Sequence, residues 1–465
     1  MRTTTFFNAV RRCVLVSTFL SSAVLTACAT LPDVESIIQE MPHLERAPEI
    51  FDSRGTLSDE ERETIIHGLE GQAGCTNFVK QYIPFMGSIT DFPLIAGNKV
   101  TLFRDSPDID AAMFRAIQSA KNHINLETFS FADDKTGRHL AELLLQKRTE
   151  GVQVNLIYDS AGCFCTPPSF FQRLRDGGVR AVEFNPLGPA DAMNIFNRDH
   201  RKILIVDGMI AFAGGVNIVH TYSRSMHSRY EASDDGLSWR DTHIQIEGPV
   251  VADLQKLFLD TWEKKKGPQL PRQQYFPSRK NVGDDLVRIV GSTPGKMNRV
   301  TYMMYVAAIT FAENRIHLTN AYFAPDEDLI IALVHAAERG VDVKIILPGI
   351  SDWSVVSKAG RSYYSRLLKA GVKLYERRGT VLHAKTGVID GVWSTVGTTN
   401  LDLWSLLRNN EVNVVILGED FARHMEDMFT LDLADSDQIR LEEWEKRSLG
   451  QRVKEWFARL FVYWL

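Results

Sequence analysis

The chain has 465 residues, of which 44% are hydrophobic and 24% charged, and its formal net charge is −5. This composition is typical of an ordinary globular protein and excludes a disordered or fibrous one. The length allows two domains, and the acidic balance argues against a dedicated nucleic-acid binder, which needs a strongly basic surface.

The N-terminus has the pattern of an export signal. Arginines at positions 2, 11 and 12 precede an apolar run over residues 13–25, which is too short to span a bilayer comfortably. Leu-Thr-Ala-Cys at residues 25–28 resembles a bacterial lipobox, in which the signal is cut before a cysteine that receives a lipid. The alternatives are an ordinary signal peptide or an uncleaved anchor. We expect a lipoprotein-type signal peptide over residues 1–27, lipidation of Cys28, and a membrane-associated, extracytoplasmic protein.

Three further cysteines lie in the body of the chain: Cys75, Cys163 and Cys165. In an oxidising compartment three cysteines allow one disulfide and one spare thiol. Cys75 could pair with either of the other two, and the sequence does not decide between them. A Cys-x-Cys sequence alone is not a convincing metal site. We expect no metal and no cofactor in this protein.

Residues 28–86 are polar and helix-prone, which predicts a tether followed by a helical preamble. Ser58 and Glu61 have the spacing of a capping box. From about residue 94 helices and strands alternate according to their apolar periodicity. The expected elements are a helix over 108–121, a strand over 123–131, a helix over 137–151 and a strand over 152–159.

The same order of elements recurs about 190 residues further along the chain, which indicates a duplicated unit. The second set is a helix over 306–314, a strand over 315–323, a helix over 327–340 and a strand over 341–348. Alternating strands and helices predict an α/β sandwich in each half. We expect homologous halves over 87–275 and 276–440, joined by a surface linker within 263–281 that is rich in Pro, Gln and basic residues.

A short motif occurs once in each half with identical spacing. The first copy consists of His200, Lys202, Asp207, Gly214 and Asn217. The second copy consists of His383, Lys385, Asp390, Gly397 and Asn400. Either copy alone is more often a surface pair and a turn, whereas two copies in register predict a functional site.

The residue types of the motif suit a phosphate. A lysine supplies charge to nonbridging oxygens, and an imidazole can attack phosphorus or transfer a proton. We therefore expect His200, Lys202, His383 and Lys385 to be catalytic. The amides of Asn217 and Asn400 are candidate phosphate donors, and the small Gly214 and Gly215 are expected to let the backbone approach a ligand.

Acidic residues complete the expected site. Asp241 and Glu411 each open the strand that follows a motif, and we expect them to orient the histidines by accepting a ring N–H. Asp207 and Asp390 are counted with the catalytic motif by their spacing. The alternation of the strand places each of them opposite in phase to its histidine, so we expect them to hold loop backbone.

Two half-sites imply one shared active site at a pseudo-twofold axis. The histidines would then face one phosphorus from opposite sides, one attacking while the other protonates the leaving oxygen. The sequence does not show which histidine is the nucleophile.

The double motif resembles the signature of the phospholipase D superfamily, and the resemblance extends from about residue 94 to residue 439. The details resemble bacterial cardiolipin synthases at residues 158–162, 239–249, 321–329, 360–376 and 397–415. The resemblance implies two phospholipase D-like halves and metal-independent phosphatidyl transfer through a phosphohistidine. It also implies phospholipid substrates such as phosphatidylglycerol and a membrane surface as partners, with no nucleic acid.

Some details depart from that family and leave alternatives open. Many cardiolipin synthases begin with two transmembrane helices, often carry Arg at the position of Trp404, and often have Gly-Ser where this chain has Gly214 and Gly215. A hydrolytic phospholipase D is the main alternative, and a secreted nuclease or an inactive scaffold are others.

Three segments outside the motifs are expected to bear on lipid binding. Loops over 163–171 and 351–356 should flank the entrance, where apolar residues such as Phe170 and Trp353 would seat acyl chains or exclude water. The alternative is that these loops only pack on neighbouring loops. Residues 441–465 are expected to form one amphipathic helix, which either lies in a bilayer interface or packs on the protein body. Its apolar residues are Val453, Trp456, Phe457, Leu460, Phe461 and Trp464.

Overall fold

A computed structural model describes residues 34, 48–71, 76–188, 196–219, 239–294 and 299–460. These residues belong to one compact unit, Val34–Leu465. The expected signal peptide with Cys28, and also Cys75, lie outside the described residues. Within the described part of the chain, no helix is long and apolar enough to cross a membrane.

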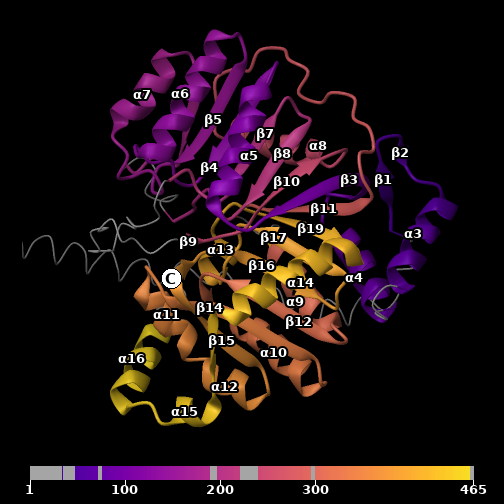
Figure 1. Cartoon of the computed structure of the whole chain (residues 1–465), viewed down its shortest axis with the longest axis vertical. Helices are drawn as coiled ribbons and strands as arrows, with labels where there is room; N and C mark the ends of the chain where they lie inside the picture. Colours follow the sequence, from indigo (N-terminus) through magenta and orange to yellow (C-terminus); the bar gives the residue numbers. More distant parts are fainter. Residues whose placement is uncertain are drawn as a thin grey trace, which may run out of the picture. The chain divides into compact units, whose positions relative to one another are not determined.

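The first half is an α/β layer built on one run of strands (Figure 1). Neighbouring strands follow the order β3-β10-β8-β7-β4-β5-β6, in which β4, β5 and β6 are parallel and the other pairs antiparallel. Its elements are β3 Leu94–Phe103, α5 Ser106–Ser119, β4 His123–Thr128, α6 Lys135–Thr149, β5 Gln153–Asp159, α7 Pro168–Asp176, β6 Arg180–Phe184, β7 Ile203–Val206, β8 Ile210–Gly214, β9 Trp239–Arg240, β10 His243–Glu247 and α8 Val251–Lys264.

The second half repeats this order strand for strand, as β11-β19-β17-β16-β12-β14-β15. The matching topology confirms the expected duplication. Its elements are β11 Asp285–Ser292, α9 Val300–Phe311, β12 Arg315–Asn320, β13 Phe323–Ala324, α10 Glu327–Glu338, β14 Asp342–Ile350, α11 Ser354–Arg361, α12 Tyr364–Lys369, β15 Lys373–Leu382, β16 Lys385–Ile389, β17 Trp393–Gly397, β18 Leu401–Asp402, α13 Leu403–Leu407, β19 Glu411–Leu417, α14 Glu419–Ala434 and β20 Ser436–Ile439.

The two halves share a sheet and a core. β3 pairs antiparallel with β11, the equivalent strand of the other half, and β9 pairs with β15. A continuous apolar cluster contains residues of α8 from the first half and α14 from the second, together with strand residues of both. Burial of this apolar surface, worth about 25 cal/mol per Å², fixes one half against the other.

The segment before β3 is part of the folded body rather than a tether from residue 48 onward. β1 (Ile50–Asp52) pairs with β2 (Gly55–Thr56) and with β3. α3 (Asp59–Gly71) begins at the expected capping box, in which Ser58 N–H donates to Glu61 Oε2 at 3.0 Å. α4 (Thr76–Ile89) packs on the second half through ring contacts of Tyr82 with Trp393 and of Phe85 with Phe311.

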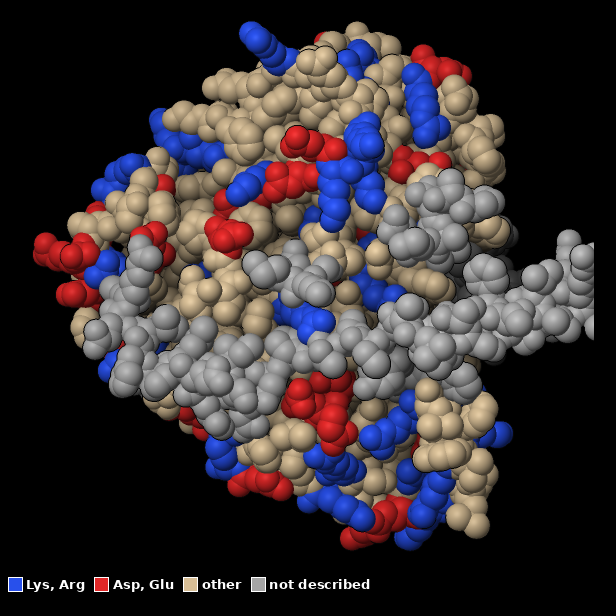
Figure 2. Space-filling view, turned by 180° about the vertical axis from the view of Figure 1, so that it is seen from behind, with Lys and Arg blue, Asp and Glu red and all other residues tan. Residues whose placement is uncertain are grey.

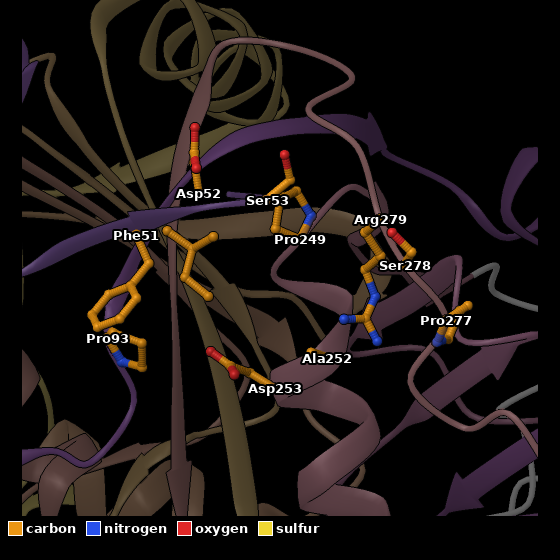
Figure 3. Close-up of a pocket in the computed structure, with 11 residues that line it drawn as sticks. Phe51, Asp52, Ser53, Pro93, Pro249, Ala252, Asp253, Pro277, Ser278 and Arg279 are labelled. Atoms are coloured by element: carbon orange, nitrogen blue, oxygen red, sulfur yellow. The ribbon is translucent and has the colours of Figure 1, made fainter. Parts of the chain in front are cut away.

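The linker between the halves lines an open pocket of about 410 Å³. Its walls come from β1, the start of α8 and the linker itself (Figure 3). Asp253 Oδ2 and Arg279 Nη2 line it and have no hydrogen-bond partner among the described residues. None of the motif residues lines this pocket, so it is separate from the expected site.

The C-terminal segment forms two short helices instead of one long helix. α15 (Leu441–Glu445) ends before Ser448, which caps α16 (Leu449–Arg459) through a capping box with Gln451. α16 packs against α11. Phe461 and Trp464 lie outside the described residues.

Candidate active site

Both histidines lie at the junction of the halves and directly before a strand. The expected strand over each motif begins later, at Ile203 for β7 and at Lys385 for β16. The backbone N–H of His200 donates to the carbonyl of Asn410 at 2.9 Å, and that of His383 donates to the carbonyl of Arg240 at 2.8 Å. Each histidine is therefore hydrogen-bonded to the opposite half.

Each histidine also contacts a carboxylate of the opposite half. His200 Nδ1 lies 3.0 Å from both oxygens of Glu411. His383 Nδ1 lies 2.7 Å from Asp241 Oδ2. Glu411 and Asp241 are fully buried. Because a carboxylate accepts the Nδ1–H, the Nε2 lone pair of each ring is available for attack or proton transfer.

Both motif lysines are buried beside the histidines. Lys202 Nζ donates to the carbonyl of His200 at 2.7 Å, and Lys385 Nζ donates to the carbonyl of His383. Burial lowers the pKa of Lys202 to about 7 and that of Lys385 to about 8. An anionic ligand stabilises the charged form of a buried lysine strongly, because its charge offsets the free-energy cost of desolvating the ammonium.

The histidines are poised in their neutral form. Burial and the charge of Lys385 lower the pKa of His383 to about 3, and burial also lowers the pKa of His200. Burial alone would raise the pKa of Glu411 and Asp241, but their histidine partners and the lysines lower it on balance. The site therefore contains two neutral imidazoles, each held by an ionised carboxylate.

Asp207 and Asp390 hold loop backbone. Asp207 accepts from the backbone N–H groups of residues 121–123 at 2.7–2.9 Å. Asp390 accepts from those of residues 313–315, each at 2.8 Å. Both lie at positive φ, 55° and 53°, in the turn that ends the strand. They are motif residues that position the strand, and they do not contact the histidines.

The two asparagines are buried and partly engaged by protein groups. Asn217 Oδ1 accepts from the backbone N–H of Ser130 at 3.3 Å, and Asn400 Nδ2 donates to Ser405 Oγ at 3.4 Å. These bonds orient the side chains, and their role as phosphate donors stays a prediction.

The glycines of the first motif pack closely against neighbouring groups. A Cβ at Gly215 would overlap the carboxylate of Asp241, and one at Gly214 would overlap His243. Gly214 also adopts φ 151°, which other residues rarely adopt. Gly215 therefore makes room for the carboxylate that binds His383. The expected approach of the backbone to a ligand stays a prediction.

Several site residues escaped the sequence analysis. Thr398 Oγ1 donates to Glu411 Oε2, and Asn409 Nδ2 donates to Glu411 Oε1 at 3.1 Å. Phe129 packs edge-on to His200 with ring centroids 5.1 Å apart, whereas Tyr322 does so to His383 at 6.2 Å. Phe129 and Tyr322 are one residue out of register between the two copies, so comparison of the repeats could not pair them.

Of the two aromatic residues expected at the entrance, one is exposed and the other is buried in the core. Trp353 is 37% exposed and contacts Tyr322, with ring centroids 6.2 Å apart. Phe170, in contrast, is 5% exposed and packs in the core against Phe131. Phe170 therefore does not line the entrance, because α7 turns it inward. Phe164, at 66% exposure, is the outward aromatic of that loop.

Two cysteines lie in the part of the chain that the structure describes. Cys163 is buried and Cys165 exposed, and they are not bonded to each other. No group of three or more His, Cys, Asp and Glu side chains suited to a metal ion occurs in the part of the chain that the structure describes.

Comparison with known proteins assigns the family. A family model described as "Cardiolipin synthase, PLD-like domain" matches residues 113–232 and 305–433, one region in each half. The cardiolipin synthase of Halalkalibacterium halodurans is 34% identical over 372 residues, which cover 79% of this chain and 72% of the relative. The chain belongs to the cardiolipin synthase family of the phospholipase D superfamily. Cardiolipin synthase A of Pseudomonas syringae is also 34% identical, over 79% of this chain and 76% of the relative.

Solved structures agree on the fold. Phosphatidylserine synthase of Haemophilus influenzae superposes with a TM-score of 0.60 at 13% identity and covers 81% of this chain and 96% of its own. Family membership confirms the resemblance and makes this chain a phosphatidyltransferase of the phospholipase D type. It also explains why two half-sites come together, since each PLD-like half contributes one histidine, one lysine and one carboxylate.

Proposed function

We propose that this protein makes cardiolipin by moving a phosphatidyl group from one glycerophospholipid, such as phosphatidylglycerol, to a hydroxyl of another. The observation that carries the proposal is the crossed pair of His–carboxylate contacts beside two buried lysines. The similarity to cardiolipin synthases of other bacteria supports this product class.

The first chemical step forms a phosphohistidine. Nε2 of one imidazole attacks phosphorus, the bond from phosphorus to the headgroup oxygen breaks, and the second histidine gives a proton to the departing glycerol. Lys202 and Lys385 balance the charge on the nonbridging oxygens, with Asn217 and Asn400 as further donors. Entry of the anionic phosphate offsets the burial that lowers the histidine pKa values, which lets one imidazole carry the proton.

The second step regenerates the enzyme. The second histidine takes the proton of the incoming lipid hydroxyl, whose oxygen attacks phosphorus while the bond from phosphorus to nitrogen breaks. Water in place of that hydroxyl would give phosphatidate. Hydrolysis by a phospholipase D is therefore the alternative outcome of the same intermediate.

A product assay decides between the two outcomes. Phosphatidylglycerol vesicles are incubated with the protein, and cardiolipin plus glycerol are measured against phosphatidate. We expect cardiolipin to dominate, and phosphatidate as the main product would establish the hydrolase instead. His200→Ala and His383→Ala should each abolish both products, whereas His67→Ala on exposed α3 is a matched control that should not.

We also infer that the protein is an extracytoplasmic lipoprotein anchored through Cys28. The arginines, the short apolar run and the lipobox-like ending support this proposal. Mass spectrometry of the mature N-terminus tests it. A diacylglyceryl group on an N-terminal Cys28 is the expected result, and a chain that begins at Met1 or carries an unmodified Cys28 would refute the anchor.

A further inference from the structure

The last helix of the described chain has one face fixed to the protein. Glu455 and Ala458 of α16 are buried where the helix packs against α11. Glu455 pairs with Arg447 at 3.0 Å, and the side chain of Arg459 lies over the ring of Tyr363 at 4.7 Å. Because a capping box at Ser448 also closes its first turn, α16 is held in one orientation.

The opposite face of α16 is apolar and exposed. Five large side chains follow the spacing i, i+4, i+7, i+8 and i+11, which places them on one stripe. Their exposed fractions range from 54% to 77%, in Leu449, Val453, Trp456, Phe457 and Leu460. Single exposed apolar residues are common, but a continuous stripe of this size marks an interaction surface.

Charge on α16 indicates what covers that stripe. Arg452 and Lys454 are exposed on the same helix, whereas its one acid, Glu455, is buried and paired with Arg447. In Figure 2 the lower right edge, where α16 lies, is tan with blue atoms beside it. An aromatic and aliphatic stripe flanked by cations matches the headgroup and acyl boundary of an anionic bilayer. The sequence beyond the described residues continues the apolar character, with Phe-Val-Tyr-Trp-Leu at 461–465.

α16 is connected to the active site through its neighbour. Trp353 directly precedes α11, on which α16 packs. Its ring contacts Tyr322, whose ring contacts His383. Val355 on the first turn of α11 is 39% exposed. A surface that holds α16 is therefore coupled by direct packing to the rim of the second half-site.

We propose that α16 docks on the surface of an anionic phospholipid bilayer and brings the rim at Trp353 to the lipid headgroups. The use of this docking to supply substrate rests on the proposed transferase function, whereas the docking itself does not. The stripe gives depth of insertion, the cations give preference for anionic lipid, and the packing on α11 sets the orientation.

Hydrogen exchange of the full chain tests the docking at the helix itself. Exchange is followed by mass spectrometry with phosphatidylglycerol vesicles, with phosphatidylcholine vesicles and without lipid. We expect peptides from 449–460 to exchange severalfold more slowly with phosphatidylglycerol than without lipid, and less so with phosphatidylcholine. Peptides from α14, which carries the exposed Leu431, serve as the internal reference and should not change. Unchanged exchange over 449–460 would overturn the proposal, and protection that rises with protein concentration in the absence of lipid would show a protein partner instead.

A variant separates docking from chemistry. Trp456→Ser/Phe457→Ser/Leu460→Ser should raise the apparent KM for phosphatidylglycerol vesicles about tenfold and leave kcat on a short-chain, micelle-free phosphatidylglycerol unchanged. Leu431→Ser, 53% exposed on α14, is the matched control and should alter neither value. An unchanged vesicle KM in the triple variant would refute the docking role. Wild-type protein without activity on either lipid would refute the transferase, while the exchange experiment would still report on docking.

Discussion

At the scale of single residues, the crossed carboxylates make a sharp prediction. Glu411→Gln keeps the shape of the side chain but removes the charge that holds His200 in one tautomer. An equivalent Asp to Asn change in a hydrolase triad costs about 10⁴ in kcat. We expect a loss of about 10³–10⁴ in kcat for Glu411→Gln and for Asp241→Asn, with circular dichroism unchanged. A kcat within tenfold of wild type would show that the carboxylates are not needed to orient the histidines.

The lysines predict the pH dependence at the same scale. Lys202 and Lys385 bind phosphate only while protonated, and burial lowers their pKa values to about 7 and about 8. The profile of kcat/KM, which reports the free enzyme, should therefore fall as the pH rises through this range. Its acid limb should lie below 6.5, since both histidine pKa values are lowered from there. Lys202→Arg, whose charge persists at alkaline pH, should move the alkaline limb upward if it retains activity. An alkaline limb that stays near pH 10 in the wild type would contradict this assignment.

At the scale of elements, two aromatic residues in equivalent loops have opposite roles. Phe170 on α7 is buried against Phe131, so Phe170→Ser should lower the free energy of unfolding by about 3–5 kcal/mol. Trp353 lies at the rim, so Trp353→Ser should cost little stability but raise the share of phosphatidate. Denaturant unfolding and the product ratio measure the two effects. Destabilisation by Trp353→Ser equal to that of Phe170→Ser would place both residues in the core.

The elements also show why the loop residues were hard to assign from sequence. Both loops follow corresponding strands, β5 and β14, and both contain apolar residues. Their direction depends on the next helix. Phe170 and Phe171 lie within α7, which turns them into the core, whereas Trp353 lies just before α11 and stays at the surface. Apolar periodicity in the sequence cannot predict which of the two side chains is buried, because burial depends on where each helix packs.

At the scale of the whole molecule, both half-sites belong to one chain. β3 pairs with β11, and Arg201 of the first half donates to the carbonyls of Glu411 and Ser292 in the second at 3.1 and 2.7 Å. A mixture of the full-length His200→Ala and His383→Ala proteins should therefore remain inactive in the transfer assay. Recovery of activity on mixing would mean that the active site is completed between two chains.

The sequence by itself determined the duplication and the residue types of the candidate site. The spacing from His200 to Asn217 is identical to that from His383 to Asn400. Because spacing is a local property of the chain, it can be recognised without the structure. The backbone role of Asp207 and Asp390 also followed from strand alternation, which is local as well. The alternation of helices and strands in each half could be predicted for the same reason, since apolar periodicity marks each element.

Tertiary structure alone decided which groups meet. Glu411 binds His200 across 211 positions and Asp241 binds His383 across 142, and only the packing of the two halves brings them together. The same packing assigned Gly215 to make room for Asp241 and left the apolar stripe of α16 exposed. Contacts between halves depend on rigid-body placement, which no period or spacing along the chain encodes, because the periodicity of a helix or strand describes only its own faces.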